Sequence, residues 1–487
     1  MKVQPYGIHW FRRDLRVAGN AALHWNRQKH GGRVVGLFCC DATMLVGSGF
    51  SANRFGFFLK TLQALREELR DAGSDLLVLD CQPTEALRRL AAAARPGAVS
   101  FSGDYEPRAR ARDARVSALL TEELGVPVHT ERDHLVFEPW EITKDGGADD
   151  YYKVYTPYAK RWLQRSMTAE FQTRIDAQRE GLAYLEERLA GVKPQEPLFC
   201  LGWKGVLGTR AKTFPDACDG LQKKNAPLVT VPLPEAGSLA AYKRARNFAW
   251  KLPSYPVNRD HPAAVATSKL SIYLANGSLT TSQLIALMGL KHGIFLQQFM
   301  WREFYHSILW HCPRVEREAF LEKYKDLQWE NNPALFDAWR EGRTGYPIVD
   351  AGMRELATTG WMHNRVRMIT ALFLVKDLLI DWRWGEKHFM EQLLDGDLAA
   401  NNGGWQWAAS TSCEAQPHFR LINPALQSEE FDKEGAYIRN HVPELKDVGW
   451  RDIHNPDEAT RRGCGYPAPV VHHASRKAQA LALFTAG

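Results

Sequence analysis

The chain has 487 residues, of which 45% are hydrophobic and 24% charged, and its formal net charge is +6 at pH 7. This length predicts about two or three domains, and the composition excludes a disordered or membrane-spanning protein because no apolar run approaches the length of a membrane span. The eight cysteines are scattered without a CxxC pair, which argues against a disulfide framework or a cysteine-ligated metal and favours the cytoplasm. The mild positive charge permits a polyanionic partner.

Short β-rich runs alternate with helical ones over the first part of the chain. Buried strands are predicted at 7–11, 33–41, 75–80, 98–105 and 126–130, and helices between them at 57–73, 84–94 and 108–125. This order predicts an α/β domain over residues 1–132, with a mostly parallel, Rossmann-like sheet covered by helices on both faces. No GxGxxG or P-loop motif follows these strands, so the usual dinucleotide site of such a sheet is not expected here.

The composition changes after the predicted sheet. Pro, Gly and Lys are frequent between residues 133 and 235, as in KDGGADD and KPQEPL, and this predicts a long surface linker. Residues 236–487 have an almost entirely helical pattern without an internal repeat, which predicts an all-α second domain. The second half of segment 345–382 is apolar nearly all round, so we expect that helix to be buried.

Two features of the helical region suggest a ligand site. On a helix containing WMHNRVRMITALF, Asn364 and Met368 lie four residues apart and share a face, which suits a pocket wall better than a core. Arg365 and Arg367 flank this face, although two such arginines are more often solvated or ion-paired. The hydroxyls of ATSKLS (266–271) either hold a phosphate at the start of a helix or merely cap that helix.

Tryptophan is unusually frequent, with 16 in the chain, and it is concentrated between Trp301 and Trp450. In DGDLAANNGGWQWAAS (395–410), acids, asparagines and a Gly pair lead directly into two tryptophans one residue apart. Such clusters form either a large core or a stacking platform for planar ligands. Composition does not decide between the two.

Four longer motifs share one family resemblance. They are WREFYHSILW (301–310), TGYPIVDAGMRELATTGWMHNRVRMITALFLVKDLLIDWRWGE (344–386), DGDLAANNGGWQWAAS and FRLINPALQSEEFDKEGAYIR (419–439). Together they resemble the photolyase/cryptochrome family, and most of all its bacterial class I cyclobutane-dimer photolyases. The opening HWFRRDLRVAGNAAL (9–23) is also similar to that family, so the resemblance covers nearly the whole chain.

The resemblance implies a blue-light-driven, FAD-dependent carbon–carbon lyase that repairs pyrimidine dimers in UV-damaged DNA. FAD would lie folded into a U within the helical domain. By position, the residues that resemble those holding its phosphates and ribityl chain are Tyr242, Thr267, Ser268, Leu270 and Ser271. The residues that resemble those around the flavin and adenosine are Arg302, Asn364, Asp395 and Asp397, with Asn401 beside flavin N5.

The resemblance also assigns roles in electron transfer and DNA recognition. Trp405, Trp382 and Trp329 resemble an electron-transfer chain from the protein surface to the flavin. The residues that resemble those around a flipped pyrimidine dimer are the aromatic walls Trp301 and Trp407, with Gln298, Asn364 and Met368. Arg365, Arg367 and Arg420 resemble arginines that contact DNA phosphates, which would give sequence-independent affinity. We expect a monomer.

The sequence departs from this family pattern at Gln298. Dimer-splitting members usually carry a Glu there, and Gln brings no negative charge and no transferable carboxyl proton. Relatives that act on the six-four photoproduct carry Gln, but they use histidines where this chain has Asn364 and Met368. An alternative function is therefore a cryptochrome-like blue-light photoreceptor with weak or no repair activity.

Two further departures concern the cofactors. The segment 247–266, close to the expected flavin phosphates, looks longer than in close relatives. Glu106 resembles one contact to a second, folate-type antenna chromophore, whereas Glu316 stands where a lysine is expected. FAD is thus the expected cofactor, with a folate-type antenna as a second chromophore implied by Glu106 alone.

Overall fold

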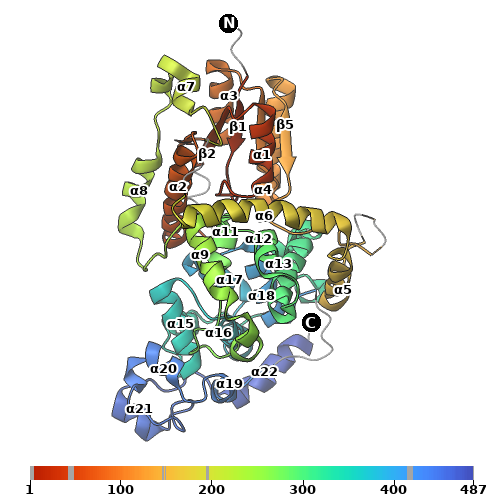
Figure 1. Ribbon diagram of the computed structural model, residues 1–487. Coiled ribbons are helices and arrows are strands. Elements are labelled where there is room, and N and C mark those ends of the chain that lie inside the picture. Colours follow the sequence, from red (N-terminus) through yellow and green to blue (C-terminus); the bar gives the residue numbers. More distant parts are fainter. Residues whose placement is uncertain are drawn as a thin grey trace.

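The computed structural model describes residues 5–41, 49–144, 147, 150–192, 197–413 and 421–485. Its first region is built on a five-stranded sheet in which each neighbouring pair of strands is parallel (Figure 1). The strands, in spatial order, are β3 (Leu76–Leu79), β2 (Val34–Cys39), β1 (Gly7–Trp10), β4 (Ala98–Ser102) and β5 (Val128–Glu131). The predicted parallel, Rossmann-like sheet is confirmed.

Helices cover both faces of this sheet because its strands are apolar on both sides. From β2, Val35, Leu37 and Cys39 point into one core cluster, which contains residues of α3 (Pro83–Ala93) and α4 (Pro107–Ala118). Val34 and Phe38 point into the opposite cluster, with residues of α1 (Ala21–Lys29) and α2 (Ala52–Asp71). The sequence analysis assigned no element to α1, which buries only Ala22 and Leu23 among its apolar side chains.

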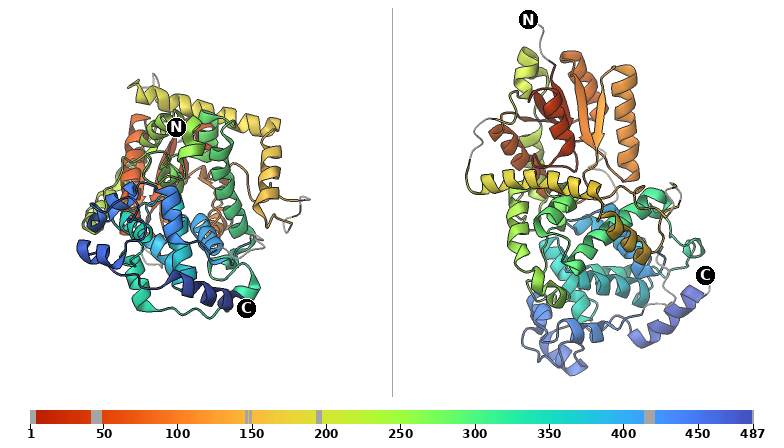
Figure 2. Two further views of the ribbon diagram at one scale, coloured as in Figure 1. Left: turned by 90° about the horizontal axis from the view of Figure 1, so that it is seen from below. Right: turned by 45° about the vertical axis from the view of Figure 1, so that its right-hand side comes forward.

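The linker is more ordered than its composition indicates. It contains α5 (Tyr155–Arg165), α6 (Ala169–Leu189), α7 (Trp203–Leu207) and α8 (Cys218–Asn225). Phe171, Ile175, Leu182 and Leu185 are buried at helical spacing along α6. This helix runs along the junction between the sheet and the helical region (Figures 1 and 2). The expected loose connector is therefore largely a packed layer, because these apolar residues bury one face of the helix.

Beyond the linker, the described residues form helices and contain no strand, as predicted. The helices used below are α9 (Ser238–Ala249), α10 (Tyr255–Asn258), α11 (Ser271–Asn276), α12 (Thr281–Met288), α13 (Gly293–His311), α15 (Pro347–Thr359), α16 (Asn364–Leu372), α17 (Trp382–Gln392) and α18 (Leu398–Ala409). The remaining ones are α14 (Pro333–Arg340), α19 (Pro424–Phe431), α20 (Ala436–His441), α21 (Glu458–Cys464) and α22 (His473–Thr485). No helix in the described ranges is long and apolar enough to cross a membrane.

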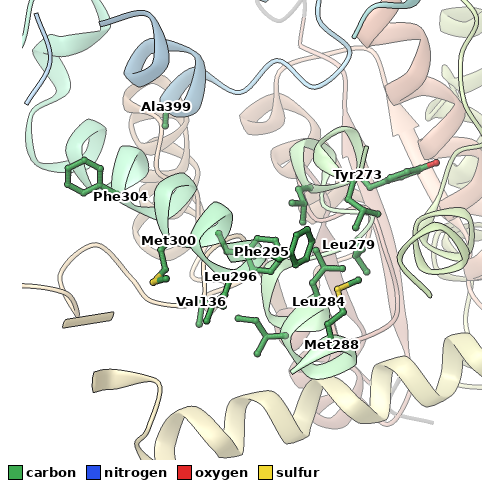
Figure 3. Packing of buried hydrophobic residues seen from close by; sticks show 14 of the residues in the cluster. Val136, Tyr273, Leu279, Leu284, Met288, Phe295, Leu296, Met300, Phe304 and Ala399 are labelled. Carbon is green, nitrogen blue, oxygen red and sulfur yellow. The ribbon is translucent and has the colours of Figure 1, made fainter. Parts of the chain in front are cut away.

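Two apolar clusters organise the helical region. The first surrounds α13, whose Phe295, Leu296, Met300 and Phe304 follow one another along the helix in Figure 3. The second contains residues of α15, α16 and α18, together with the buried segment after α16 that was expected from its apolar sequence. α13 and α18 pack against each other, so the WREF and WQW motifs lie on neighbouring helices.

Candidate functional site

A cavity of about 440 Å³ lies in the helical domain, between α9, the segment 262–269 and the residues before α16. Its lining combines positive charge, hydroxyls and aromatic rings. The cations are Lys243, Arg244, Lys251 and Lys269, the hydroxyls include Thr267 and Ser268, and the rings include Phe248, Tyr273 and Trp361. Only two carboxylates, Glu235 and Glu355, are among the lining residues. Burial lowers the pKa of the neighbouring His363 to about 4.

One face of α9 supplies much of this lining. Lys243, Arg244, Asn247 and Phe248 repeat at helical spacing, so their side chains share a side, and Lys251 follows just after the end of the helix. The sequence reasoning missed the cations of this face, although the spacing was a signal that could have identified them.

Tyr242 was predicted to hold the cofactor, but it does not line the cavity. Its hydroxyl donates to Glu186 on α6 at 2.6 Å, and its ring packs with Leu182 and Leu185. It therefore faces away from the cavity, because one step along a helix turns a side chain by about 100°. Leu270 and Ser271 also lie outside the lining: Leu270 is buried and Ser271 is exposed at the start of α11.

The backbone of Lys269, in the cavity wall, is held in an unfavourable conformation. Its φ is 51°, a left-handed conformation that non-glycine residues adopt at a cost. The Lys269 ammonium lies 4.2 Å from the centroid of the ring of Trp361, which also lines the cavity. Residues in such conformations cluster at ligand sites, which agrees with the charge and shape of the cavity.

Asp395, a predicted flavin-side residue, is connected to the cavity wall through Arg367. Asp395 accepts two hydrogen bonds from Arg367, at 3.1 and 2.9 Å, and Arg367 also donates to the Met362 carbonyl at 2.8 Å. Met362 stands between Trp361 and His363, which line the cavity. Arg367 was predicted to contact DNA, but here its guanidinium is committed to a carboxylate.

Arg365, the second arginine predicted to contact DNA, is also engaged by an acidic side chain. Arg365 pairs with Asp260 at 3.0 Å and lies 4.2 Å from the ring of Phe431. The paired state that the sequence left open is therefore the one observed for both Arg365 and Arg367. Arg420 lies outside the described residues.

Asp397 joins the two domains. Its carboxylate accepts from Arg13 of the β1 loop at 2.7 Å and lies 3.4 Å from His306. Burial by itself would raise the pKa of Asp397, but His306, His134 and Arg13 together hold it well below its ordinary value. Asp397 also accepts from the backbone of Ala400 at 3.0 Å and so caps α18.

The same cluster contains two more predicted site residues. Arg302 donates to the His134 carbonyl at 2.9 Å and points a second nitrogen at that histidine's Nε2. Glu106, the predicted antenna contact, is paired with Arg13 at 2.5 Å, and burial raises its pKa. Its carboxylate is therefore already engaged by a guanidinium within the domain junction.

His134, His306 and Asp397 hold one potential metal-ligand atom each within 4.8 Å of one another. However, Arg13 and Arg302 both direct guanidinium nitrogens at His134 Nε2. Two fixed cations this close oppose a divalent cation, so the cluster is better explained as an ion-paired junction.

The WQW motif separates its two indoles. Trp405 is buried, with its ring centroid 4.9 Å from Phe389 and 6.0 Å from Trp339, whereas Trp407 is half-buried. Gly385 permits this packing, because a Cβ there would come within 2.1 Å of the Trp405 ring. Of the other predicted electron carriers, Trp382 is buried and Trp329 is half-buried against Phe484.

Asn401, predicted beside the flavin, donates to the Glu386 carbonyl at 3.0 Å. Two residues further along α18, Gly403 lies against the ring of Tyr305, where a Cβ would come within 2.1 Å. The small residues of this helix thus allow close approach of a ring, here one from α13.

Of the predicted lesion residues, Gln298 and Trp301 lie within α13, Asn364 and Met368 lie on α16, and Trp407 lies on α18. Trp301 is half-buried, and Gln298 donates to the Ile294 carbonyl of its own helix at 3.0 Å. Asn364 is exposed and its amide lies 3.8 Å from the Met368 sulfur, so the shared face expected from their spacing is present. Tyr155 of the linker stacks on Trp301.

Comparison with known families adds two matches. Residues 7–178 match the family described as DNA photolyase, and residues 295–486 match the FAD-binding domain of DNA photolyase. The chain is 36% identical to the deoxyribodipyrimidine photo-lyase of Escherichia coli K12, with 98% of each chain covered. It is 35% identical to the enzyme of that name from Synechococcus, covering 98% of this chain and 96% of the relative.

Solved structures show the same architecture. A bacterial class III photolyase from Agrobacterium tumefaciens superimposes with a TM-score of 0.81 at 31% identity, covering 100% of this chain and 98% of the other. An archaeal photolyase from Sulfolobus tokodaii, solved with two FAD molecules, gives 0.79 at 28% identity, with 99% and 100% covered. A Synechocystis cryptochrome at 24% identity shares the fold, with a TM-score of 0.82 and coverage of 99% and 100%.

Proposed function

The chain belongs to the photolyase/cryptochrome family, and we propose that it is a blue-light-driven, FAD-dependent deoxyribodipyrimidine photo-lyase that repairs pyrimidine dimers in DNA. The observation that carries this proposal is the full-length similarity to enzymes of that name, at 36% identity over 495 residues. Both halves of the chain take part in this similarity, so it is not limited to a cofactor module.

The cavity beside α9 suits the phosphate-bearing part of FAD. A volume of about 440 Å³ lies within the usual range of ligand pockets. Lys243, Arg244 and Lys269 would neutralise the diphosphate, and the Thr267 and Ser268 hydroxyls would donate hydrogen bonds to it. Phe248 and Trp361 offer apolar contact to a ring system. When bound, reduced and light-excited FAD supplies the electron that opens the two carbon–carbon bonds of the dimer and then returns.

The chain's own residues would serve this chemistry in three places. Asp395, Asp397, Arg302, Asn364 and Asn401 are proposed to surround the flavin and adenosine. Trp405, Trp382 and Trp329 are proposed to carry electrons from the surface, and the burial of the first two keeps water from their rings. Trp301 and Trp407, with Gln298, Asn364 and Met368, are proposed to hold the extruded dimer.

We propose UV-damaged DNA as the partner of a monomeric enzyme. Lys153 and Lys160 are exposed on and before α5, and this helix packs on α13 beside Trp301. Such cations give salt-dependent affinity for phosphates on either side of a lesion. A folate-type antenna remains a separate proposal, in which Glu106 would have to exchange its pairing with Arg13 for a contact to the chromophore.

The direct test uses purified protein with reduced FAD and a single-stranded oligonucleotide that carries one thymine dimer. Blue light should restore two intact thymines, and a dark sample is the control. If fully reduced, FAD-loaded protein converts no dimer, the proposed function is rejected.

A second candidate function is blue-light reception without repair, and Gln298 favours it because a carboxyl proton is absent there. A gel shift separates the two functions in the dark. Selective binding to dimer-containing DNA supports the enzyme, whereas photoreduction of FAD without such binding supports the receptor.

A further inference from the structure

We propose that Tyr155 is a positioning residue for lesion recognition: it forms the fixed base of a stack in which Trp301 holds the extruded pyrimidine dimer. This inference rests on the proposed function. It assigns part of the lesion site to the linker, outside the motifs by which the family resemblance was detected.

The geometry of the two rings is the primary observation. The centroids of Tyr155 and Trp301 are 3.6 Å apart, and their planes differ by only 5°. The rings are thus in parallel contact over their faces. Trp301 is partly exposed although Tyr155 covers one of its faces. Phe304 and Tyr305 meet the same indole at 81° and 36°, with centroids 5.8 and 5.6 Å away, so Tyr155 is the parallel ring of this group and the remaining exposed part of the indole is what a base could contact.

The helix that carries Tyr155 is firmly attached to α13. Three side chains of α5 at positions 155, 158 and 162 face α13, as the helical repeat requires. Tyr158 is buried, with its ring centroid 5.3 Å from that of Phe304. Trp162 is fully buried and donates from Nε1 to Glu303 at 2.6 Å. Tyr155 therefore sits on a rigid element and not on a loop.

Rings and a hydrogen bond hold Tyr155 from the side of α13 as well. Phe304 meets both Tyr155 and Trp301 edge-on, at centroid distances of 5.9 and 5.8 Å. The Tyr155 hydroxyl donates to the Gln297 carbonyl at 3.4 Å, in the turn that also carries Gln298. Tyr155 thus holds the plane of Trp301 chiefly through its ring, since a hydrogen bond of 3.4 Å is long and weak.

This arrangement has a consequence for binding. An indole held in one plane loses little freedom when a base stacks on it, and such preorganisation increases affinity. Loss of the Tyr155 ring should leave Trp301 free to rotate. Affinity for the dimer should then fall, whereas contacts to the phosphates should not change.

The test compares Tyr155→Leu, which removes the ring, with Tyr155→Phe, which keeps it. Tyr151→Leu is the matched control, because Tyr151 is also a linker tyrosine stacked on α13, with its ring centroid 4.7 Å from that of His311 at the C-terminal end of that helix. Dissociation constants are measured in the dark for a dimer-containing oligonucleotide and for its undamaged twin. Repair is then measured under saturating blue light to separate KM from kcat.

We expect Tyr155→Leu to weaken dimer binding about 2- to 10-fold, the range that one aromatic pair contributes. Undamaged DNA should bind as before, KM should rise, and kcat should stay within about twofold. Tyr155→Phe and Tyr151→Leu should resemble the wild type. If Tyr155→Leu loses FAD or does not fold, Tyr155→His, which keeps a smaller planar ring, is expected to give an intermediate dissociation constant.

Dimer affinity in Tyr155→Leu equal to the wild type would overturn the inference, and so would an equal loss in Tyr151→Leu. Failure of the proposed function has a different signature. Wild-type protein would then bind the damaged and undamaged oligonucleotides equally, whatever the variants do.

Discussion

At the scale of single residues, neighbouring side chains of one motif have different surroundings. Trp405 is buried among Phe389 and Trp339, while Trp407, two residues later, is half-buried near the surface. Positions two apart on a helix differ by about 200° in direction, so they face different partners. One short motif can thus serve both an electron-transfer side and a substrate side.

Replacement of Trp382 by Phe tests the proposed electron carriers. A phenyl ring is harder to oxidise than an indole, so blue-light reduction of bound FAD should slow at least about tenfold, the effect of about 1.4 kcal/mol on a barrier. The measurement is the loss of oxidised-flavin absorbance under illumination. Trp384→Phe is the control, because Trp384 lies on the same helix and is only partly buried. Equal slowing in both variants would contradict the assignment.

Gln298 allows a gain-of-function experiment. Gln298→Glu introduces a carboxyl where the amide now donates to the Ile294 carbonyl of its own helix at 3.0 Å. A charged hydrogen bond is worth about 1.5–3 kcal/mol against about 1 for a neutral one, so we expect the repair rate to rise about 3- to 10-fold. Gln297→Glu on the exposed side of the same turn is the control. An unchanged rate would show that the amide is sufficient.

At the scale of elements, the two faces of α9 have separate tasks. One face packs Tyr242 against α6, and the other directs Lys243 and Arg244 into the cavity. The linker helix α5 is similarly divided, with Tyr158 and Trp162 in the core and Lys160 in solvent. These divisions follow from helical periodicity, and they place the residues proposed to bind the cofactor and the lesion on elements that pack into the core.

The cations on the cavity face of α9 should contribute to the affinity for FAD. Because each charged hydrogen bond to a phosphate contributes about 1.5–3 kcal/mol, Lys243→Ala combined with Arg244→Ala should weaken FAD binding at least about tenfold. Titration of the apoprotein with FAD, followed by flavin fluorescence, measures this. Arg246→Ala is the control, since Arg246 lies on the same helix and pairs with Glu186. A similar loss in the control would reject the phosphate assignment.

The raised pKa of the buried Glu303 carboxyl should make the stability of the protein depend on pH. Burial raises the pKa of Glu303 from 4.5 to about 7, although Trp162 and Val136 donate hydrogen bonds to it. Between these pH values the folded state keeps a proton that the unfolded state has lost, so this group makes stability fall as pH rises. Glu303→Gln should make that slope shallower between pH 5 and 7 in thermal unfolding. Part of the slope should remain in the variant, because burial also raises the pKa of Glu138 and of Glu386 to about 7. A slope as steep as in the wild type would contradict the assignment.

At the scale of the whole molecule, the two domains meet through buried charge as well as apolar packing. Arg13, on the loop after β1, donates to Asp397 at 2.7 Å, to Glu106 at 2.5 Å and to the Ala275 carbonyl at 3.1 Å. Since Asp397 caps the helix that carries Asn401 and both tryptophans of WQW, the sheet domain directly supports the proposed flavin site.

Arg13→Ala should therefore destabilise the protein by about 2–4 kcal/mol, because it leaves the buried Asp397 and the partly buried Glu106 without this cation. Urea unfolding followed by tryptophan fluorescence measures the change. Arg343→Ala, which removes an exposed pair with Glu341, should cost less than about 1 kcal/mol. If the two variants have similar effects, the junction does not depend on this arginine.

The sequence by itself determined the class of the fold and the family. Strand-like and helical runs follow from side-chain periodicity, which is local, and so the parallel sheet and the helical region could be predicted. The long motifs around WREF and WQW identified the family from the sequence alone, because so many matching positions in a row rarely arise by chance. Asn364 and Met368 share a face for the same local reason.

Only the tertiary structure decided which side chains meet across long distances in the chain. It turned Tyr242 toward α6, paired Arg365 and Arg367 with acids, and joined Arg13 to Asp397. It also brought Tyr155 of the linker onto Trp301. Such contacts depend on how whole elements pack, since a helix face is fixed by local sequence but its partner is fixed by the global arrangement of elements.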